Sequence, residues 1–247
     1  MCYNSNNLII SSERDIRTIK ELLGSGRKIG LSLQYSVQEK PEGLAQSLII
    51  AEEFLDGGPS TLVLGDNLFH GKGMTGLLEG AVEELERQGG CHLFATSVPD
   101  PSRFGIVEVD GGGSIISIEE KPSNPKSNLA VVGLYMYDGS APRRARSLKP
   151  SPRGELEITD LNMTYVEEEK GVVSEFGRGV TWLDTGTPMS LQSASAYIHA
   201  VQTNTGKKIA CIEEVSWRKG NISKKMMIEA ISDYPEGNEY GEYIRKL

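Results

Sequence analysis

The stretch Thr61-Leu62-Val63-Leu64-Gly65-Asp66-Asn67 gives the first clear indication of the fold. Its apolar, β-branched run leads directly into a glycine and an aspartate, which predicts a buried strand that ends near Asp66. In open α/β sheets, ligands bind at the carboxyl ends of the strands. The stretch therefore predicts a sheet strand with a candidate site at its end.

Strand and helix patterns alternate on both sides of this stretch. Strands are predicted over 7–10, 31–37 and 92–98, and helices over 12–23, 44–55 and 75–87. Alternation at these lengths is typical of an α/β fold. We expect a Rossmann-like, mostly parallel mixed sheet with helices on both faces.

The pattern changes after about residue 100. Two apolar runs flank Gly111-Gly112-Gly113, which predicts a hairpin, and a further strand over 129–137 and a helix over 156–168 follow. We expect these antiparallel strands on one side of the parallel core. From Pro188 the chain is predicted to be mostly helical, with an apolar stripe formed by Leu191, Ala194, Ile198 and Val201.

Composition excludes several classes of function. The net charge is −8, from 34 acidic and 26 basic residues, so nonspecific binding to nucleic acid is disfavoured. No segment approaches the roughly 18–20 apolar residues of a membrane span, and Met1–Ser5 does not resemble a secretory signal. Cys2, Cys91 and Cys211 are widely spaced and predict neither a disulfide framework nor a zinc site. We expect a cytoplasmic protein.

Two aspartates follow apolar runs and are candidates for metal binding. Asp66 ends the strand described above, and Asp184 lies in Trp182-Leu183-Asp184-Thr185-Gly186-Thr187. Mg²⁺ usually takes one or two protein carboxylates and keeps water or phosphate oxygens in its other positions. The alternative for each is a turn aspartate, at Asp184 one that precedes a helix beginning at Pro188.

Two further motifs carry groups suited to a sugar phosphate or a base. Glu119-Glu120-Lys121-Pro122 places carboxylates beside a lysine at a strand end, although a solvated charge cluster would have the same sequence. The segment from Gln38 to Gln46 combines an amide able to pair with a base edge and a glycine, Gly43, that permits close backbone approach. Taken singly, each motif is a weak signal.

Read together and in order, the motifs resemble the glucose-1-phosphate thymidylyltransferases. The resemblance runs from about Leu8 to the C-terminus and rests on six segments: Val37–Gln46, Leu64–Asn67, Arg103–Glu108, Glu119–Pro122, Pro150–Asp160 and Gly177–Thr187. It implies one nucleotidyltransferase domain over 1–247, with a nucleotide-binding part (1–100), a sugar-binding part (101–187) and a helical C-terminal part (188–247). It also implies that dTTP and glucose 1-phosphate react to give dTDP-glucose and pyrophosphate, in a homotetramer that serves deoxysugar synthesis.

The resemblance also implies a role for each candidate residue. Asp66 and Asp184 would hold Mg²⁺, and Lys121 would bind the sugar phosphate. Gln38 and Gly43 would bind the thymine. The glucose pocket would be formed by Phe104, Gly105, Glu120, Val131 and Trp182.

The sequence departs from the family pattern in two places. Phe104 stands where the family often has a tyrosine. The family's first strand and its glycine-rich, triphosphate-binding loop have no counterpart here, so we expect an N-terminally truncated chain that catalyses poorly or not at all. Two alternatives follow: an inactive relative that serves as a nucleotide-sugar-binding or oligomer subunit, and a transferase for another base or sugar.

Overall fold

The computed structural model describes residues 6–232 and 234–247, and the chain forms two compact units. The first unit combines the chain up to Lys40 with Ala196–Leu247, and the second is Pro41–Ser195. These boundaries differ from the three functional parts predicted above, which remain a prediction. The interpretation of Met1–Ser5, including Cys2, lies outside the described residues.

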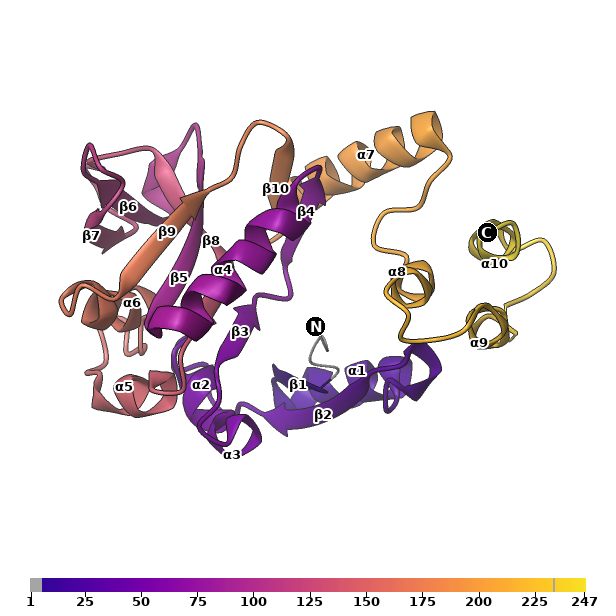
Figure 1. Ribbon diagram of the computed structural model, residues 1–247, viewed down its shortest axis with the longest axis horizontal. Coiled ribbons are helices and arrows are strands. Elements are labelled where there is room, and N and C mark those ends of the chain that lie inside the picture. The colour runs from indigo at the N-terminus through magenta and orange to yellow at the C-terminus, as the bar shows by residue number, and fades with distance from the viewer. Residues whose placement is uncertain (1–5, 233) are drawn as a thin grey trace. The chain divides into compact units, whose positions relative to one another are not determined.

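The first unit pairs a small parallel sheet with helices from both ends of the chain (Figure 1). Its elements are β1 (Asn6–Ser11), α1 (Glu13–Leu23), η1 (Arg27–Ile29), β2 (Ser32–Val37), α8 (Ile212–Arg218), α9 (Lys224–Ala230) and α10 (Glu239–Arg245). Ser12 caps α1 by accepting a hydrogen bond from the amide of Asp15, and the helix ends at Gly24, as its pattern predicts. Cys211, Met227 and Ile244 belong to the small core of the C-terminal helices.

The second unit is built on a six-stranded mixed sheet. Its strands are β3 (Ser60–Val63), β5 (Cys91–Ser97), β6 (Gly105–Val109), β7 (Ile115–Glu120), β8 (Leu129–Tyr137) and β9 (Gly171–Glu175). They follow the order β7-β6-β8-β5-β9, and β3 pairs with β8 as well. A separate antiparallel ribbon joins β4 (Asn67–Gly71) to β10 (Val180–Asp184).

Strand direction confirms the mixed α/β class but changes one detail of the expected sheet. Strands β3, β5 and β6 are each antiparallel to β8, and β9 is parallel to β5, so four of the six strands run the same way. The antiparallel β8 lies in the middle of the sheet, however, and not on one side as expected. Most hydrogen-bonded neighbours in this sheet are consequently antiparallel.

Helices cover both faces of this sheet, as predicted. Helix α4 (Met74–Gln88) packs Ala81 and Leu85 against one face, which includes Phe94 and Val132. The other face packs against α2 (Gln46–Ile50), α5 (Ala141–Ser147) and α6 (Ile158–Val166). Figure 1 shows α4 lying across the strands, with α5 and α6 near their ends.

Two helical predictions need adjustment, and one helix had no predicted counterpart. The predicted helix over 44–55 is divided at Ala51 into α2 and α3 (Glu52–Leu55). Helix α7 (Pro188–Thr205) forms, but only Ala194 of its apolar stripe is buried, and Leu191 is 53% exposed. Helix α5 was not predicted.

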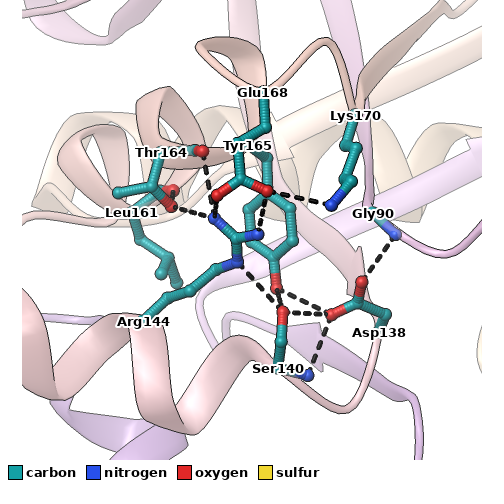
Figure 2. Close-up of polar contacts among 9 residues, drawn as sticks. All are labelled: Gly90, Asp138, Ser140, Arg144, Leu161, Thr164, Tyr165, Glu168 and Lys170. Carbon is teal, nitrogen blue, oxygen red and sulfur yellow. Dashed lines mark hydrogen bonds and ion pairs between the residues drawn. The ribbon is translucent and has the colours of Figure 1, made fainter.

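A polar network ties the end of β8 to α5 and α6 (Figure 2). The carboxylate of Asp138 accepts hydrogen bonds from the amides of Gly90 (2.7 Å) and Ser140 (2.9 Å) and from the hydroxyl of Tyr165 (3.1 Å). Burial alone would raise the pKa of Asp138, but these hydrogen bonds outweigh it and lower that pKa. Arg144 lies over the ring of Tyr165 at 4.1 Å.

Candidate active site

The structure brings Asp66 and Asp184 together at one end of the β4–β10 ribbon. Asn67, which follows Asp66, is paired with Asp184 across the ribbon. The amide and hydroxyl of Thr185 both donate to the carbonyl of Asp66, at 2.9 and 2.8 Å. A Cβ atom built on Gly186 would lie 3.2 Å from Asp184 Oδ1 and 3.6 Å from Asp66 Oδ2. Both carboxylates therefore border the space that this glycine leaves open.

This pair of carboxylates has the composition that Mg²⁺ requires. Mg²⁺ is commonly bound by one or two carboxylates, with water and phosphate oxygens as its other ligands. Across residues 6–232 and 234–247, no group of three or more His, Cys, Asp or Glu side chains is arranged to hold a metal ion. An ion at Asp66 and Asp184 would take further ligands from water or from the phosphates of a substrate.

Both aspartates also make local contacts. Asp184 Oδ1 accepts a hydrogen bond from the amide of Gly186 at 3.1 Å, which is the turn contact that the alternative interpretation predicts. The guanidinium of Arg103 lies 3.8 Å from Asp184 Oδ2. Asp66 Oδ1 accepts from the side-chain amide of Asn67 at 2.7 Å. The turn role and a role in metal binding are compatible, because each carboxylate has two oxygens.

A second group of predicted residues meets where β6 and β7 pair. Gly105 is the partner of Glu120 across the hairpin. Glu120 Oε2 accepts a hydrogen bond from the Thr159 hydroxyl at 2.7 Å, and a Cβ on Gly105 would lie 3.3 Å from each of these two oxygens. The absence of a side chain at Gly105 leaves the carboxylate of Glu120 accessible at this position.

Lys121 follows Glu120 in an unusual backbone conformation. Its φ of 43° is positive, and its amide donates to the carbonyl of Phe104 at 3.0 Å. Its ammonium lies 3.7 Å from Glu120 Oε1, and the side chain is half exposed. The ammonium is therefore accessible from solvent while it lies close to the Glu120 carboxylate.

Sequence interpretation missed Arg153, although its segment was part of the family resemblance. The guanidinium lies 3.7 Å from Glu120 Oε1 and 2.8 Å from Glu157 Oε2. Burial alone would raise the pKa of Glu157, but hydrogen bonds from Ser151 and Arg153 lower it. A lone arginine in a loop carries no periodic signal, and only the tertiary contacts reveal its place.

Aromatic side chains lie beside these groups. Phe104 and Trp182 meet edge to face, with ring centroids 5.1 Å apart, and the indole N–H of Trp182 donates to Asn67 Oδ1 at 2.6 Å. Val131 is buried in the sheet core on β8. The described contacts thus join Phe104 to Trp182, while Val131 packs in the sheet core and its place in the glucose pocket remains a prediction.

The two residues predicted to bind the base fall in different units. Gln38 follows β2 in the first unit, where its amide donates to the carbonyl of Ser11 at 2.9 Å. Gly43 belongs to the second unit and has a φ of 101°. Any Cβ at Gly43 would collide with the backbone of Leu156, so the close approach predicted for this glycine is made to the chain itself. The base-binding role of Gln38 and Gly43 remains a prediction.

A fold with helices on both sides of a mixed sheet, together with paired carboxylates at a ribbon end, agrees with the class found by comparison. Residues 2–201 match the family model described as nucleotidyl transferase. The chain therefore belongs to the nucleotidyl transferase family, whose members generally use a divalent metal.

Two similar relatives within this family have the same name. Glucose-1-phosphate thymidylyltransferase from Neisseria gonorrhoeae is 45% identical over 97% of this chain and 82% of its own length. The protein of the same name from Xanthomonas campestris pv. campestris (strain B100) is 44% identical over 97% of this chain and 80% of its own length.

Solved structures agree with the fold. A Bacillus anthracis protein assigned as a glucose-1-phosphate thymidylyltransferase, in complex with sucrose, aligns with a TM-score of 0.69 and 39% identity over 77% of this chain and 74% of its own. A UDP-glucose pyrophosphorylase in complex with UDP-glucose aligns with a TM-score of 0.67 over 79% of this chain and 81% of its own. At 20% identity, the second likeness concerns the fold alone.

Proposed function

We propose that the chain is a glucose-1-phosphate thymidylyltransferase, which forms dTDP-glucose and pyrophosphate from dTTP and glucose 1-phosphate for deoxysugar synthesis. Family membership supports this activity. The observation that carries it is the convergence of Asp66 and Asp184, far apart in sequence, on the space beside Gly186. A transferase that acts on a nucleoside triphosphate needs such an anionic site for its metal.

The reaction is an in-line displacement at phosphorus. An oxygen of the sugar phosphate forms a bond to the α-phosphorus of dTTP, and the bond from that phosphorus to the pyrophosphate group breaks. Such transfers depend on positioning and on neutralisation of charge. Asp66 and Asp184 would hold Mg²⁺, which would supply charge neutralisation at the phosphates.

The remaining candidate residues would orient the two substrates. The Lys121 ammonium, half exposed beside Glu120, would bind the sugar phosphate, and Arg153 would add a second cation close by. The Glu120 carboxylate would accept hydrogen bonds from sugar hydroxyls. Phe104, Gly105, Val131 and Trp182 would form the walls of the glucose pocket, and Gln38 and Gly43 would bind the thymine.

We also propose that the protein works as a homo-oligomer, a tetramer by family resemblance, in the cytoplasm. Helix α7 offers apolar surface that another copy could cover, since Met189 is 72% and Leu191 53% exposed. Within the described part of the chain, no helix combines the length and apolar character needed to cross a bilayer.

A pyrophosphate-release assay with dTTP, glucose 1-phosphate and Mg²⁺ tests the activity. Against the poor catalysis expected from the sequence, the proposed activity requires that the wild-type chain release pyrophosphate, and only with the metal. Asp66→Asn should lose this activity. Asp56→Asn is a matched control, because Asp56 ends α3 in a left-handed conformation that asparagine also adopts readily. Release that survives Asp66→Asn would contradict the proposal. A folded wild-type chain that binds dTDP-glucose without turnover would instead be a binding subunit.

A further inference from the structure

Asn67 is hydrogen-bonded to three different parts of the second unit. Its Oδ1 accepts from the indole N–H of Trp182 at 2.6 Å and from the amide of Gly133 at 3.0 Å, while its Nδ2 donates to Asp66 Oδ1 at 2.7 Å. Two N–H donors face the same oxygen, so the orientation of the side-chain amide is fixed by its partners. A single planar group therefore joins an aromatic side chain, the central strand and a carboxylate.

The turn that carries Asn67 is itself anchored on β8. The amide of Asn67 donates to the carbonyl of Leu64 at 3.1 Å, and the amide of Leu64 donates to the carbonyl of Gly133 at 2.9 Å. A Cβ on Gly133 would lie 2.7 Å from both Asn67 Oδ1 and the Leu64 side chain. The glycine thus allows the turn to approach the strand closely enough for both hydrogen bonds.

The hydrogen-bond partners of Asn67 contact both halves of the candidate site, which are the group around Phe104 and Lys121 and the pair of carboxylates Asp66 and Asp184. On one side, the Trp182 indole contacts Phe104, whose carbonyl accepts the amide of Lys121 at 3.0 Å. On the other side, the carboxylate of Asp66 borders the space beside Gly186. Rotation of the Asn67 amide would break contacts on both sides together, because its oxygen and its nitrogen belong to one rigid plane.

We propose that Asn67 is a positioning residue that couples the indole of Trp182 to the carboxylate of Asp66. A change at the carboxylate is transmitted to the aromatic wall through the side-chain amide. The roles given to the two halves, metal binding and sugar binding, rest on the proposed function, but the coupling itself rests on the three hydrogen bonds.

Tryptophan fluorescence measures this coupling without any substrate or metal. The chain has two tryptophans, so Trp217→Phe leaves Trp182 as the only tryptophan. Excitation at the red edge of tryptophan absorption avoids emission from the tyrosines. In that background, Asp66→Ala removes the acceptor of Asn67 Nδ2, and the emission of Trp182 should shift to the red with stronger quenching by acrylamide. Asp66→Asn keeps an oxygen at this position, so its emission should match that of Trp217→Phe alone.

A further pair of variants tests whether Asn67 transmits the change in Trp182 emission. Asn67→Ala should itself shift the emission of Trp182, and addition of Asp66→Ala should then change nothing more. Circular dichroism establishes that each variant is folded, and the comparison of Asp66→Ala with Asp66→Asn remains decisive if Asn67→Ala does not fold. An unchanged emission in folded Asp66→Ala, or an equal shift in Asp66→Asn, would overturn the coupling.

The failure of this inference can be distinguished from the failure of the proposed function. If the emission shifts as expected but no pyrophosphate is released, the coupling stands and the proposed function is refuted. If pyrophosphate is released but the emission does not shift, the proposed function stands and the coupling is refuted.

Discussion

At the scale of single residues, the contacts of the Asp184 carboxylate bear directly on the proposed binding of Mg²⁺. Asp184 is the last residue of β10, and its two oxygens face the Gly186 amide and the Arg103 guanidinium. Both carboxylate oxygens of Asp184 therefore have a protein partner when no metal ion is bound. A divalent ion bound beside Asp66 would therefore compete with Arg103 for Asp184.

We predict that Asp184→Asn lowers kcat by about 10²–10³-fold, the usual effect of losing one preorganised charge-stabilising group. The variant should also need more Mg²⁺ for half-maximal rate, because an amide is a weaker ligand for a hard cation than a carboxylate. Initial rates of pyrophosphate release across a Mg²⁺ titration check both effects. A normal rate at low Mg²⁺ would exclude Asp184 from the metal site.

Glu120 and its neighbour Glu119 provide a matched pair for sugar binding. Glu120→Gln should raise KM for glucose 1-phosphate roughly 10–100-fold, since a hydrogen bond to a charged group contributes about 1.5–3 kcal/mol. Glu119→Gln should leave KM unchanged, because Glu119 pairs with Lys126 at 2.9 Å. Steady-state kinetics with varied glucose 1-phosphate distinguish the two, and equal effects would place the sugar elsewhere.

Arg153 is a candidate site residue that the sequence motifs did not identify. The sequence motifs identified Glu120 and Lys121 because they form a compact charged cluster at a strand end. Arg153 approaches Glu120 only through the fold, at 3.7 Å, and no local spacing relates the two. Gly43 is the opposite case, because its predicted close approach is present but is made to Leu156.

At the scale of secondary-structure elements, His92 on β5 contacts both β9 and α4. The imidazole on β5 is buried, with Nε2 2.8 Å from the Ser174 hydroxyl on β9 and Nδ1 3.3 Å from Glu84 on α4. Burial lowers the pKa of His92, and the charge of Glu84 offsets this only in part. The folded state therefore favours the neutral imidazole.

We predict an acid-induced loss of stability from His92. A group whose pKa is lowered on folding stabilises the protein fully above its unfolded pKa of about 6.5, and this contribution is lost as the pH falls through the lower folded pKa. Urea unfolding of the wild type should show a steeper decline below pH 6.5 than that of His92→Gln. Identical pH profiles for the two proteins would show that His92 is not the group responsible.

The network of Figure 2 should govern the attachment of α5 and α6 to the sheet. Asp138→Ala would leave the Gly90 and Ser140 amides without this acceptor, so we expect a loss of about 2–4 kcal/mol in the free energy of unfolding. Arg146→Met on α5 breaks only the exposed pair with Glu52 and should cost less than about 1 kcal/mol. Denaturant unfolding of both variants checks the contrast, and equal losses would contradict it.

Local patterns identified the long elements and missed several short ones, among them β4, β9, β10 and α5. Helices α1 and α4 carry clear apolar periodicity and end at Gly24 and Gly89, where a glycine supplies a positive φ. Helix α5 has only seven residues and, with Arg143, Arg144 and Arg146, no visible apolar stripe. Its buried face consists of small residues and a proline, Ala141, Pro142 and Ala145, which are weak evidence for a helix in sequence alone.

At the scale of the whole molecule, sequence predicted the class but not the order of the strands. Strand β8 is apolar along its length, which indicates burial, yet nothing in Leu129–Tyr137 specifies that it lies between β5 and β6. Pairing between distant strands depends on the packing of the complete sheet. The same reason explains why the meeting of Asp66 with Asp184 was expected from family resemblance and not from spacing.

The most direct test of the whole account is competition among nucleotides. The chain would be incubated with glucose 1-phosphate, Mg²⁺ and equimolar dTTP and UTP, and its products would be identified by mass spectrometry. The account predicts dTDP-glucose as the main product, with none formed by Asp66→Asn. Predominant UDP-glucose would refute the assignment of the base, and the absence of any nucleotide sugar from a folded chain would contradict thymidylyl transfer itself.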